Sequence, residues 1–202
     1  MPNRQIVLAS HNAGKLAELQ TLLDPLGLQL LALPKISAVA PDETGKTFVE
    51  NALIKARAAA TLTGLPAIAD DSGICVSALG GAPGVHSARF AGAAASDADN
   101  NRLLLQHMHD VPPEARGAAF VCVLVYLRGA NDPTPLIATG TWRGVIATTP
   151  RGAAGFGYDP LFFVPALGMT SAELAREQKN VLSHRGIAAR GLVAQLAMAL
   201  PT

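Results

Sequence analysis

Short apolar runs and longer stretches of helical periodicity alternate along the first third of the chain. The apolar runs predict buried strands, at residues 5–9, 28–33 and 66–69. Leucines at helical spacing predict a helix over 16–26. A second apolar stripe predicts a helix that opens with a capping box at Thr47 and Glu50 and ends at Gly64. The order strand, helix, strand, helix, strand is typical of an α/β layer fold with at least a partly parallel sheet.

The middle of the chain predicts a hairpin that follows a helix. The helix is expected over 96–109, where a capping box precedes the apolar positions. Residues 116–127 and 136–148 are rich in β-branched and aromatic residues and are separated by a turn, so they predict two antiparallel strands. The sheet is therefore expected to be mixed. The segment TSAE, at 170–173, predicts a short helix.

The last predicted helix carries positive charge at the wrong end. It extends up to Leu200 and Ser183 could cap it, which leaves Lys179, His184 and Arg185 clustered at its start. Cations at a helix N-terminus oppose the helix dipole unless an anion or an electron-rich group binds there. This local conflict indicates a functional site.

Composition narrows the class of protein. Half of the 202 residues are hydrophobic and 15% are charged, so a globular protein is expected, and without repeats or linkers a single domain over 1–202. A formal net charge of +1 argues against a general nucleic-acid binder and favours a small ligand. Cys75 and Cys122 lie in apolar runs, as free thiols of a reducing compartment do. With neither a signal peptide nor a run long enough for a membrane span, we expect a soluble, cytoplasmic protein without a membrane partner.

The loop after the first predicted strand has the character of an anion site. It has the sequence SHNAGK, and its residues are Ser10, His11, Asn12, Ala13, Gly14 and Lys15. The unpaired N–H groups that open the next helix favour an anion, and Lys15 adds a cation beside them. The loop is too short for the GxxxxGK[ST] phosphate loop, and the same composition also suits a plain turn.

Two adjacent acids follow the third predicted strand. The apolar run ends on Asp70 and Asp71, and Ser72 and Gly73 come next. Neighbouring residues of an extended chain point to opposite faces, so one acid is expected to face a site. A carboxylate at the end of a buried strand needs compensation, for which Mg²⁺ is the usual cation at oxygen sites. A solvated turn explains the same residues equally well.

A glycine-rich aromatic loop supplies the remaining chemistry. The segment 151–163 holds four glycines and an Asp-Pro step, so its backbone could approach a ligand closely. Phe156 or Tyr158 could offer a stacking face. Cations for phosphates, an aromatic face for a base and an acid for Mg²⁺ are together typical of a nucleotide site.

At these residues the chain resembles the inosine triphosphatase family, whose bacterial members are the XTP/dITP diphosphatases, also called Ham1 proteins. The segments that carry the resemblance extend from residue 10 to residue 186. They are SHNAGKLAEL, ETGKTFVENALIKA, ADDSGICVSALGGAPGVHSARFAG, GFGYDPLFF and SHRG.

The resemblance implies an elongated mixed α/β fold of two lobes with a nucleotide cleft between them, and a homodimer. It implies hydrolysis of noncanonical purine nucleoside triphosphates, such as ITP, dITP and XTP, to the monophosphate and pyrophosphate. Ser10 to Lys15 would hold the triphosphate. Asp71 would bind Mg²⁺ and act as the base for the attacking water, and either Asp42 or Glu43 would assist with the metal. The remaining substrate contacts would be Ser72, Phe156, Gly157, Tyr158, Asp159, Lys179, His184 and Arg185.

Two alternatives remain open at this stage. One is a nucleotide-binding regulatory module without activity, which the acids near the phosphates disfavour because carboxylates repel phosphate unless a metal is present. The other is a related pyrophosphatase for modified pyrimidine nucleotides, against which the SHRG and FGYD segments argue.

Overall fold

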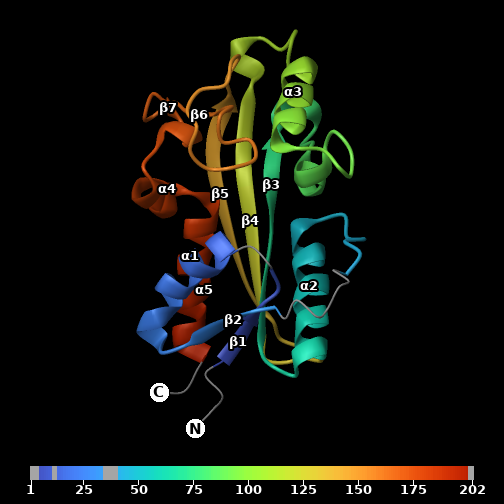
Figure 1. Ribbon diagram of the computed structural model, residues 1–202, viewed down its shortest axis with the longest axis vertical. Helices are drawn as coiled ribbons and strands as arrows, with labels where there is room; N and C mark the ends of the chain where they lie inside the picture. The colour runs from blue at the N-terminus through green and yellow to red at the C-terminus, as the bar shows by residue number, and fades with distance from the viewer. Residues whose placement is uncertain (1–4, 11–12, 34–40, 200–202) are drawn as a thin grey trace. The chain divides into compact units, whose positions relative to one another are not determined.

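A computed structural model describes residues 5–10, 13–33 and 41–199 (Figure 1). The strands are β1 (Gln5–Leu8), β2 (Gln29–Ala32), β3 (Ala67–Val76), β4 (Gly117–Leu127), β5 (Leu136–Ile146), β6 (Phe162–Val164) and β7 (Met169–Thr170). The α-helices are α1 (Ala13–Leu23), α2 (Phe48–Thr63), α3 (Asp97–His107), α4 (Arg176–Leu182) and α5 (His184–Ala199). Short 3-10 helices are η1 (Asp24–Leu26), η2 (Ser77–Leu79), η3 (Gly84–Arg89), η4 (Pro113–Ala115) and η5 (Ser171–Glu173). No helix in these ranges is both long enough and apolar enough to cross a membrane.

The strands form one mixed sheet, as the sequence predicts. Their order is β2-β1-β3-β4-β5-β6-β7. β1 pairs in parallel with β2 and β3, whereas β6 pairs antiparallel with β5 and β7. β4 and β5, the two strands of the predicted hairpin, are neighbours in the sheet.

The chain divides into two compact units, and the divisions fall within β3, β4, β5 and α5. The first unit holds 1–71, 122–140 and 187–202, and the second holds 72–121 and 141–186. The single domain and the cleft between two lobes, expected from the sequence, stay predictions.

In the first unit, helices cover both faces of the sheet (Figure 1). One face carries Ile68 and Leu124, which pack with leucines of α1 and α5. The opposite face carries Ala69 and Val125, which pack against the small residues of α2. Adjacent β3 residues thus meet different helices, because side chains alternate along a strand.

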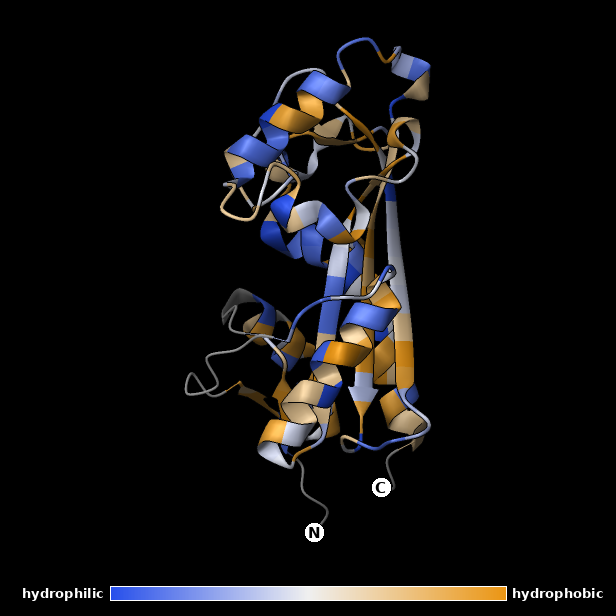
Figure 2. Cartoon of the chain, turned by 90° about the vertical axis from the view of Figure 1, so that its right-hand side faces the viewer, coloured by the Kyte–Doolittle hydropathy of each residue, from blue (hydrophilic) through white to orange (hydrophobic). Residues whose placement is uncertain are grey.

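Helix α2 begins and ends where its sequence predicts. Thr47 Oγ1 accepts a hydrogen bond from the Glu50 N–H, and the Glu50 carboxylate accepts one from the Thr47 N–H, so the capping box is complete. Gly64 ends the helix in the left-handed conformation, with φ 66°. Figure 2 shows hydrophilic and hydrophobic residues mixed along this helix, as expected when one side covers a sheet.

The second unit has its own core. Leu104 and Met108 of α3 pack with Trp142 and Phe162 of the sheet. Arg116 is buried, and its guanidinium donates to backbone carbonyls, among them that of Ile146 at 2.7 Å. These bonds satisfy a cation that has left water.

One prediction about the elements was wrong, and one helix was not predicted. The strand over 66–69 does not stop at the acids, because β3 continues through Asp70 and Asp71 to Val76. Lys15 and Lys55 pair with the carboxylates of Asp70 and Asp71, so the strand can continue with both acids buried. The separate helix α4, which carries Lys179 and precedes the final helix, was not predicted from the sequence.

Candidate functional site

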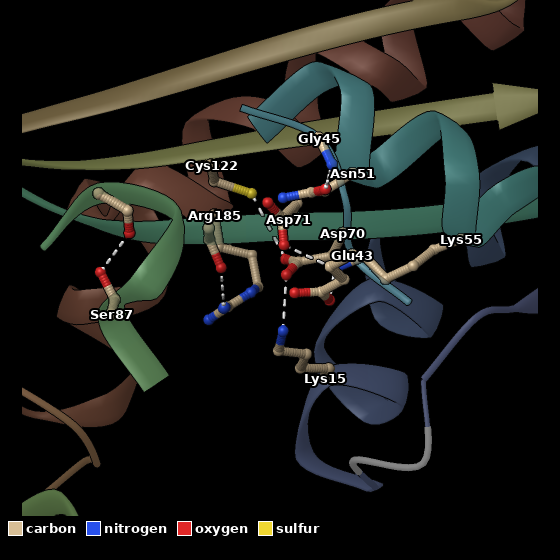
Figure 3. A network of polar contacts seen from close by, with 12 residues as sticks. Lys15, Glu43, Gly45, Asn51, Lys55, Asp70, Asp71, Ser87, Cys122 and Arg185 are labelled. Atoms are coloured by element: carbon tan, nitrogen blue, oxygen red, sulfur yellow. Dashed lines mark hydrogen bonds and ion pairs between the residues drawn. The ribbon is translucent and has the colours of Figure 1, made fainter. Parts of the chain in front are cut away.

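The two acids of β3 lie on opposite faces of the sheet, and each meets a lysine from a different helix (Figure 3). Lys15 Nζ of α1 lies 2.6 Å from Asp70 Oδ1, and Lys55 Nζ of α2 lies 2.6 Å from Asp71 Oδ1. The prediction that the acids point to opposite faces is confirmed. The solvated-turn interpretation is wrong, because both acids are buried within a strand.

Burial and charge act against each other at Asp71. Burial raises the pKa of the Asp71 carboxyl, and the attraction of Lys55 offsets this only in part. Burial alone would lower the pKa of Lys55, but the carboxylates of Asp71 and Glu43 raise it overall. Lys55 therefore stays charged and holds two acids.

Glu43 joins this group from the acidic loop. Its Oε1 lies 3.1 Å from Lys55 Nζ, while Asp42 lies exposed at the surface. We call Lys15, Glu43, Lys55, Asp70 and Asp71 the carboxylate cluster. Sequence reasoning missed Lys55, because a lysine on an amphipathic helix usually belongs to its solvated face.

The two carboxylate oxygens of Asp71 differ in their contacts, since Lys55 pairs with Oδ1. Among the described residues, no hydrogen-bond donor reaches the buried Oδ2. The described residues contain no group of three or more His, Cys, Asp or Glu side chains that could hold a metal ion. Mg²⁺ in nucleotide enzymes is commonly held by one or two carboxylates together with substrate phosphates and water. Asp71 and Glu43 fit that kind of site.

The predicted anion loop lies at the N-terminus of α1. Ser10 follows β1, Ala13 and Gly14 open the helix, and Lys15 lies in its first turn. His11 and Asn12 lie outside the described residues. The helix dipole and the Lys15 ammonium both favour an anion here, even though Lys15 already pairs with Asp70.

In the second unit, Asp159 organises the glycine-rich loop. Its Oδ1 accepts a hydrogen bond from Ser171 Oγ at 2.6 Å, and its Oδ2 accepts one from the Phe156 N–H at 2.9 Å. Lys179 of α4 forms an ion pair with the same carboxylate. Asp159 thus holds the loop and Lys179 together.

Phe156 presents an exposed ring to two cations. The ring is 54% exposed, and Lys179 Nζ and Arg185 Cζ lie 5.4 and 5.8 Å from its centroid. Arg185 also donates to Ser72 Oγ at 3.2 Å. We call Ser72, Phe156, Asp159, Lys179 and Arg185 the aromatic cluster. The ring is exposed and next to positive charge, so it suits stacking with an electron-rich base.

Two other predicted site residues are buried. Tyr158 is 4% exposed, and its hydroxyl donates to the Ser87 carbonyl at 2.9 Å, so its ring belongs to the core. Of the two rings considered for stacking, Phe156 is therefore the one at the surface. His184 stacks on Phe120 with ring centroids 4.7 Å apart.

Helix α3 forms hydrogen bonds with both the N–H and the carbonyl of Gly157 in this loop. The Gly157 N–H donates to Asp97 Oδ2 at 2.6 Å, and Asn101 Nδ2 donates to the Gly157 carbonyl at 2.8 Å. Sequence reasoning missed both α3 residues, since more than 50 positions separate them from the loop.

Comparison with known proteins identifies the family of this chain. The sequence model of the Ham1 family matches residues 6–195. A dITP/XTP pyrophosphatase of Yersinia pseudotuberculosis is 60% identical over 183 residues, which are 91% of this chain and 93% of that protein. A dITP/XTP pyrophosphatase of Pectobacterium atrosepticum is 57% identical over 190 residues, 94% of this chain and 96% of that protein.

Solved structures show the same fold. A HAM1 protein from Coxiella burnetii is 49% identical and matches with a TM-score of 0.91, over 96% of this chain and 98% of the other. The Staphylococcus aureus Ham1 protein is 40% identical and matches with a TM-score of 0.85, over 97% and 100% of the two chains. This chain belongs to the Ham1 family.

Proposed function

We propose that this protein hydrolyses noncanonical purine nucleoside triphosphates, such as dITP, XTP and ITP, to the monophosphate and pyrophosphate. It would thereby remove these nucleotides from the pool. The names of its relatives support this activity. The structural observation that carries it is the buried Asp71 carboxylate. Lys55 pairs with one of its oxygens, and the other accepts no hydrogen bond from the described residues.

Mg²⁺ is the proposed metal, and Asp71 and Glu43 would hold it. Glu43 is preferred over Asp42 because it shares Lys55 with Asp71. When bound, Mg²⁺ would offset the negative charge of the phosphates and of the pyrophosphate leaving group.

The carboxylate cluster would act on the triphosphate. Ser10 to Lys15 would bind the phosphates through the N-terminus of α1 and the Lys15 ammonium. Asp71 would take a proton from a water whose oxygen forms a bond to the α-phosphorus. The bond between this phosphorus and the bridging oxygen breaks, and pyrophosphate leaves with the electron pair.

The aromatic cluster would select the base. Phe156 would stack on the purine, with Gly157 and Tyr158 shaping the loop and Asp159 holding it in place. Inosine and xanthosine carry a 6-keto acceptor where adenosine carries an amino donor. Donors from Lys179, His184, Arg185 or the backbone would match the keto group and leave an adenine donor unpaired, a mismatch that can separate substrates by about 10⁴-fold. Ser72, which accepts from Arg185, would contact the substrate as well.

A homodimer in the cytoplasm is also part of the proposal. The homodimer follows from the family resemblance. The cytoplasmic location follows from the two cysteines, neither of which forms a disulfide, as is usual in a reducing compartment.

Release of pyrophosphate, distinguished from orthophosphate, tests the activity. The panel is ITP, XTP, dITP, GTP, ATP, dTTP and UTP, with Mg²⁺ and then with EDTA. We expect pyrophosphate from ITP, XTP and dITP at rates far above ATP and GTP, and no turnover with EDTA. Nucleotide binding without turnover would instead indicate a regulatory module, and a preference for UTP or dTTP would indicate a pyrimidine pyrophosphatase.

A further inference from the structure

Asn51 is a buried polar residue that the proposed mechanism does not use. It lies in α2 and is fully buried, with 0% of its surface exposed. Its Oδ1 accepts a hydrogen bond from the Gly45 N–H at 2.9 Å. A backbone N–H can only donate, so this bond identifies the Asn51 oxygen and leaves Nδ2 as the free end of the amide.

The chain is built to allow this contact with Gly45. A Cβ at position 45 would lie 2.6 Å from Asn51 Oδ1 and 2.6 Å from Glu50 Cβ. Only glycine therefore fits, and the amide is held in one orientation. Gly45 lies two residues after Glu43, so Asn51 also anchors the acidic loop.

The free end of the amide faces the carboxylate cluster. Asn51 precedes Lys55 by one helical turn, and residues four apart share a face of a helix. Lys55 Nζ reaches Asp71 Oδ1 from that face. Figure 3 shows the Asn51 side chain pointing toward Asp71.

Asn51 and Asp71 each bring one buried polar atom to this region. Within the described part of the chain, neither Asn51 Nδ2, a donor, nor Asp71 Oδ2, an acceptor, has a hydrogen bond. Leaving such groups unpaired is unfavourable, and buried water usually satisfies them. A water between them would accept from Asn51 and donate to Asp71.

We propose that Asn51 is a positioning residue for the attacking water, which its Nδ2 orients against Asp71 Oδ2. This inference rests on the proposed hydrolysis. The water would use one lone pair to accept from Asn51 and one hydrogen to donate to Asp71, so its second lone pair is free to attack the α-phosphorus. Asp71 then takes the proton as the bond to phosphorus forms.

Kinetics of Asn51→Ala and Asn51→Asp on ITP test the proposal. Asn51→Asp keeps an acceptor for the Gly45 N–H and so keeps the loop anchor, but it loses the donor. We expect kcat to fall about 100-fold in both variants while KM changes less than about 3-fold, the size of effect seen when one preorganised donor is removed. Thermal melting identifies any loss of folded protein.

Asn100 provides the matched control. It is 2% exposed and lies in α3, and both ends of its amide are partnered, by the Ala91 N–H at 2.8 Å and the Ala88 carbonyl at 3.2 Å. Asn100→Ala should lower the melting temperature and leave kcat of the folded fraction near that of the wild type.

Three results separate the outcomes. If Asn51→Asp is as active as the wild type and only Asn51→Ala is impaired, loop anchoring is the whole role and the proposal is overturned. A nucleotide-free crystal structure in which no water contacts both atoms would overturn it independently of activity. A wild-type protein that hydrolyses no nucleotide of the panel would refute the proposed function itself.

Discussion

Asp71 is buried, with one oxygen paired to Lys55 and the other accepting no hydrogen bond from the described residues, so its replacement should separate catalysis from binding. In Asp71→Asn the amide can neither take the proton nor carry the charge that favours a metal. We expect kcat for ITP to fall at least about 1,000-fold, within the usual range for a general base. Affinity for the nucleotide, measured by calorimetry with Ca²⁺ in place of Mg²⁺, should change much less.

Asp110→Asn is the matched control for that variant. Asp110 is 96% exposed and pairs with the exposed His109, so the kinetics of Asp110→Asn should follow those of the wild type. An Asp71→Asn protein with near-normal kcat would contradict the base role.

Replacing Lys55 tests how much its ion pairs with Asp71 and Glu43 contribute to the stability of the fold. Its side chain is 15% exposed and it faces both Asp71 and Glu43, so Lys55→Met would leave two acids without their cation. Removing one partner of a buried ion pair typically costs 3–5 kcal/mol, and we expect a loss of about 3 kcal/mol in urea unfolding. Lys46→Met, at an exposed position, should be neutral. A Lys55→Met protein as stable as the wild type would show that water compensates the acids.

The sequence predicts the elements whose ends depend on neighbouring residues. It does not predict features that depend on contacts between residues far apart in the chain. The Thr47–Glu50 capping box and Gly64 define α2 from within the helix itself, so its bounds follow from the sequence. The continuation of β3 through Asp70 and Asp71 depends on lysines of α1 and α2, which only the fold brings there. Helix α4 was not predicted, because it has only seven residues and no side-chain cap to mark its start in the sequence.

The candidate site shows the same difference between residues in local motifs and residues that only the fold brings together. Motif residues such as Lys15, Asp71 and Phe156 were found because each stands in a segment that resembles the family. Lys55 and Asn51 lie in a helix whose sequence is typical of ordinary packing, and only the fold shows their contacts with β3 and the acidic loop.

Helix α3 should affect the reaction through the loop that it holds. Asn101→Ala removes the donor to the Gly157 carbonyl, so the loop that carries Phe156 loses one of its two α3 contacts. We expect KM for ITP to rise about 5- to 10-fold, the effect of about 1 kcal/mol for one hydrogen bond, with a smaller change in kcat.

Gln106→Ala, exposed on the same helix, is the control for the loop contact and should leave KM unchanged. A KM for Asn101→Ala equal to that of the wild type would show that the Asp97 contact alone is sufficient.

For the whole molecule, the response to acid should follow carboxylates that the fold stabilises in their charged form. A hydrogen bond from Arg151 and others from Thr170 hold the pKa of Glu173 at about 2, from an ordinary 4.5. Hydrogen bonds from Ser96 and Arg102 hold that of Asp99 at about 2, from an ordinary 3.8. Arg128 lowers the pKa of Asp132 in the first unit. Acids in both units therefore prefer the folded chain while they are ionised.

The sign of the effect follows from proton uptake. Between the ordinary and the lowered pKa the unfolded chain binds more protons, so the free energy of unfolding decreases as pH falls. The contribution of Glu173 and Asp99 should be complete above about pH 5 and be lost between about pH 4.5 and 2. In urea unfolding, the double variant Asp99→Asn/Glu173→Gln should be less stable than the wild type at pH 7, and the two should converge near pH 2. As a control, Glu114→Gln, at an exposed position, should be as stable as the wild type at every pH. If the stability difference between the double variant and the wild type does not change with pH, the two acids stabilise the fold independently of their charge.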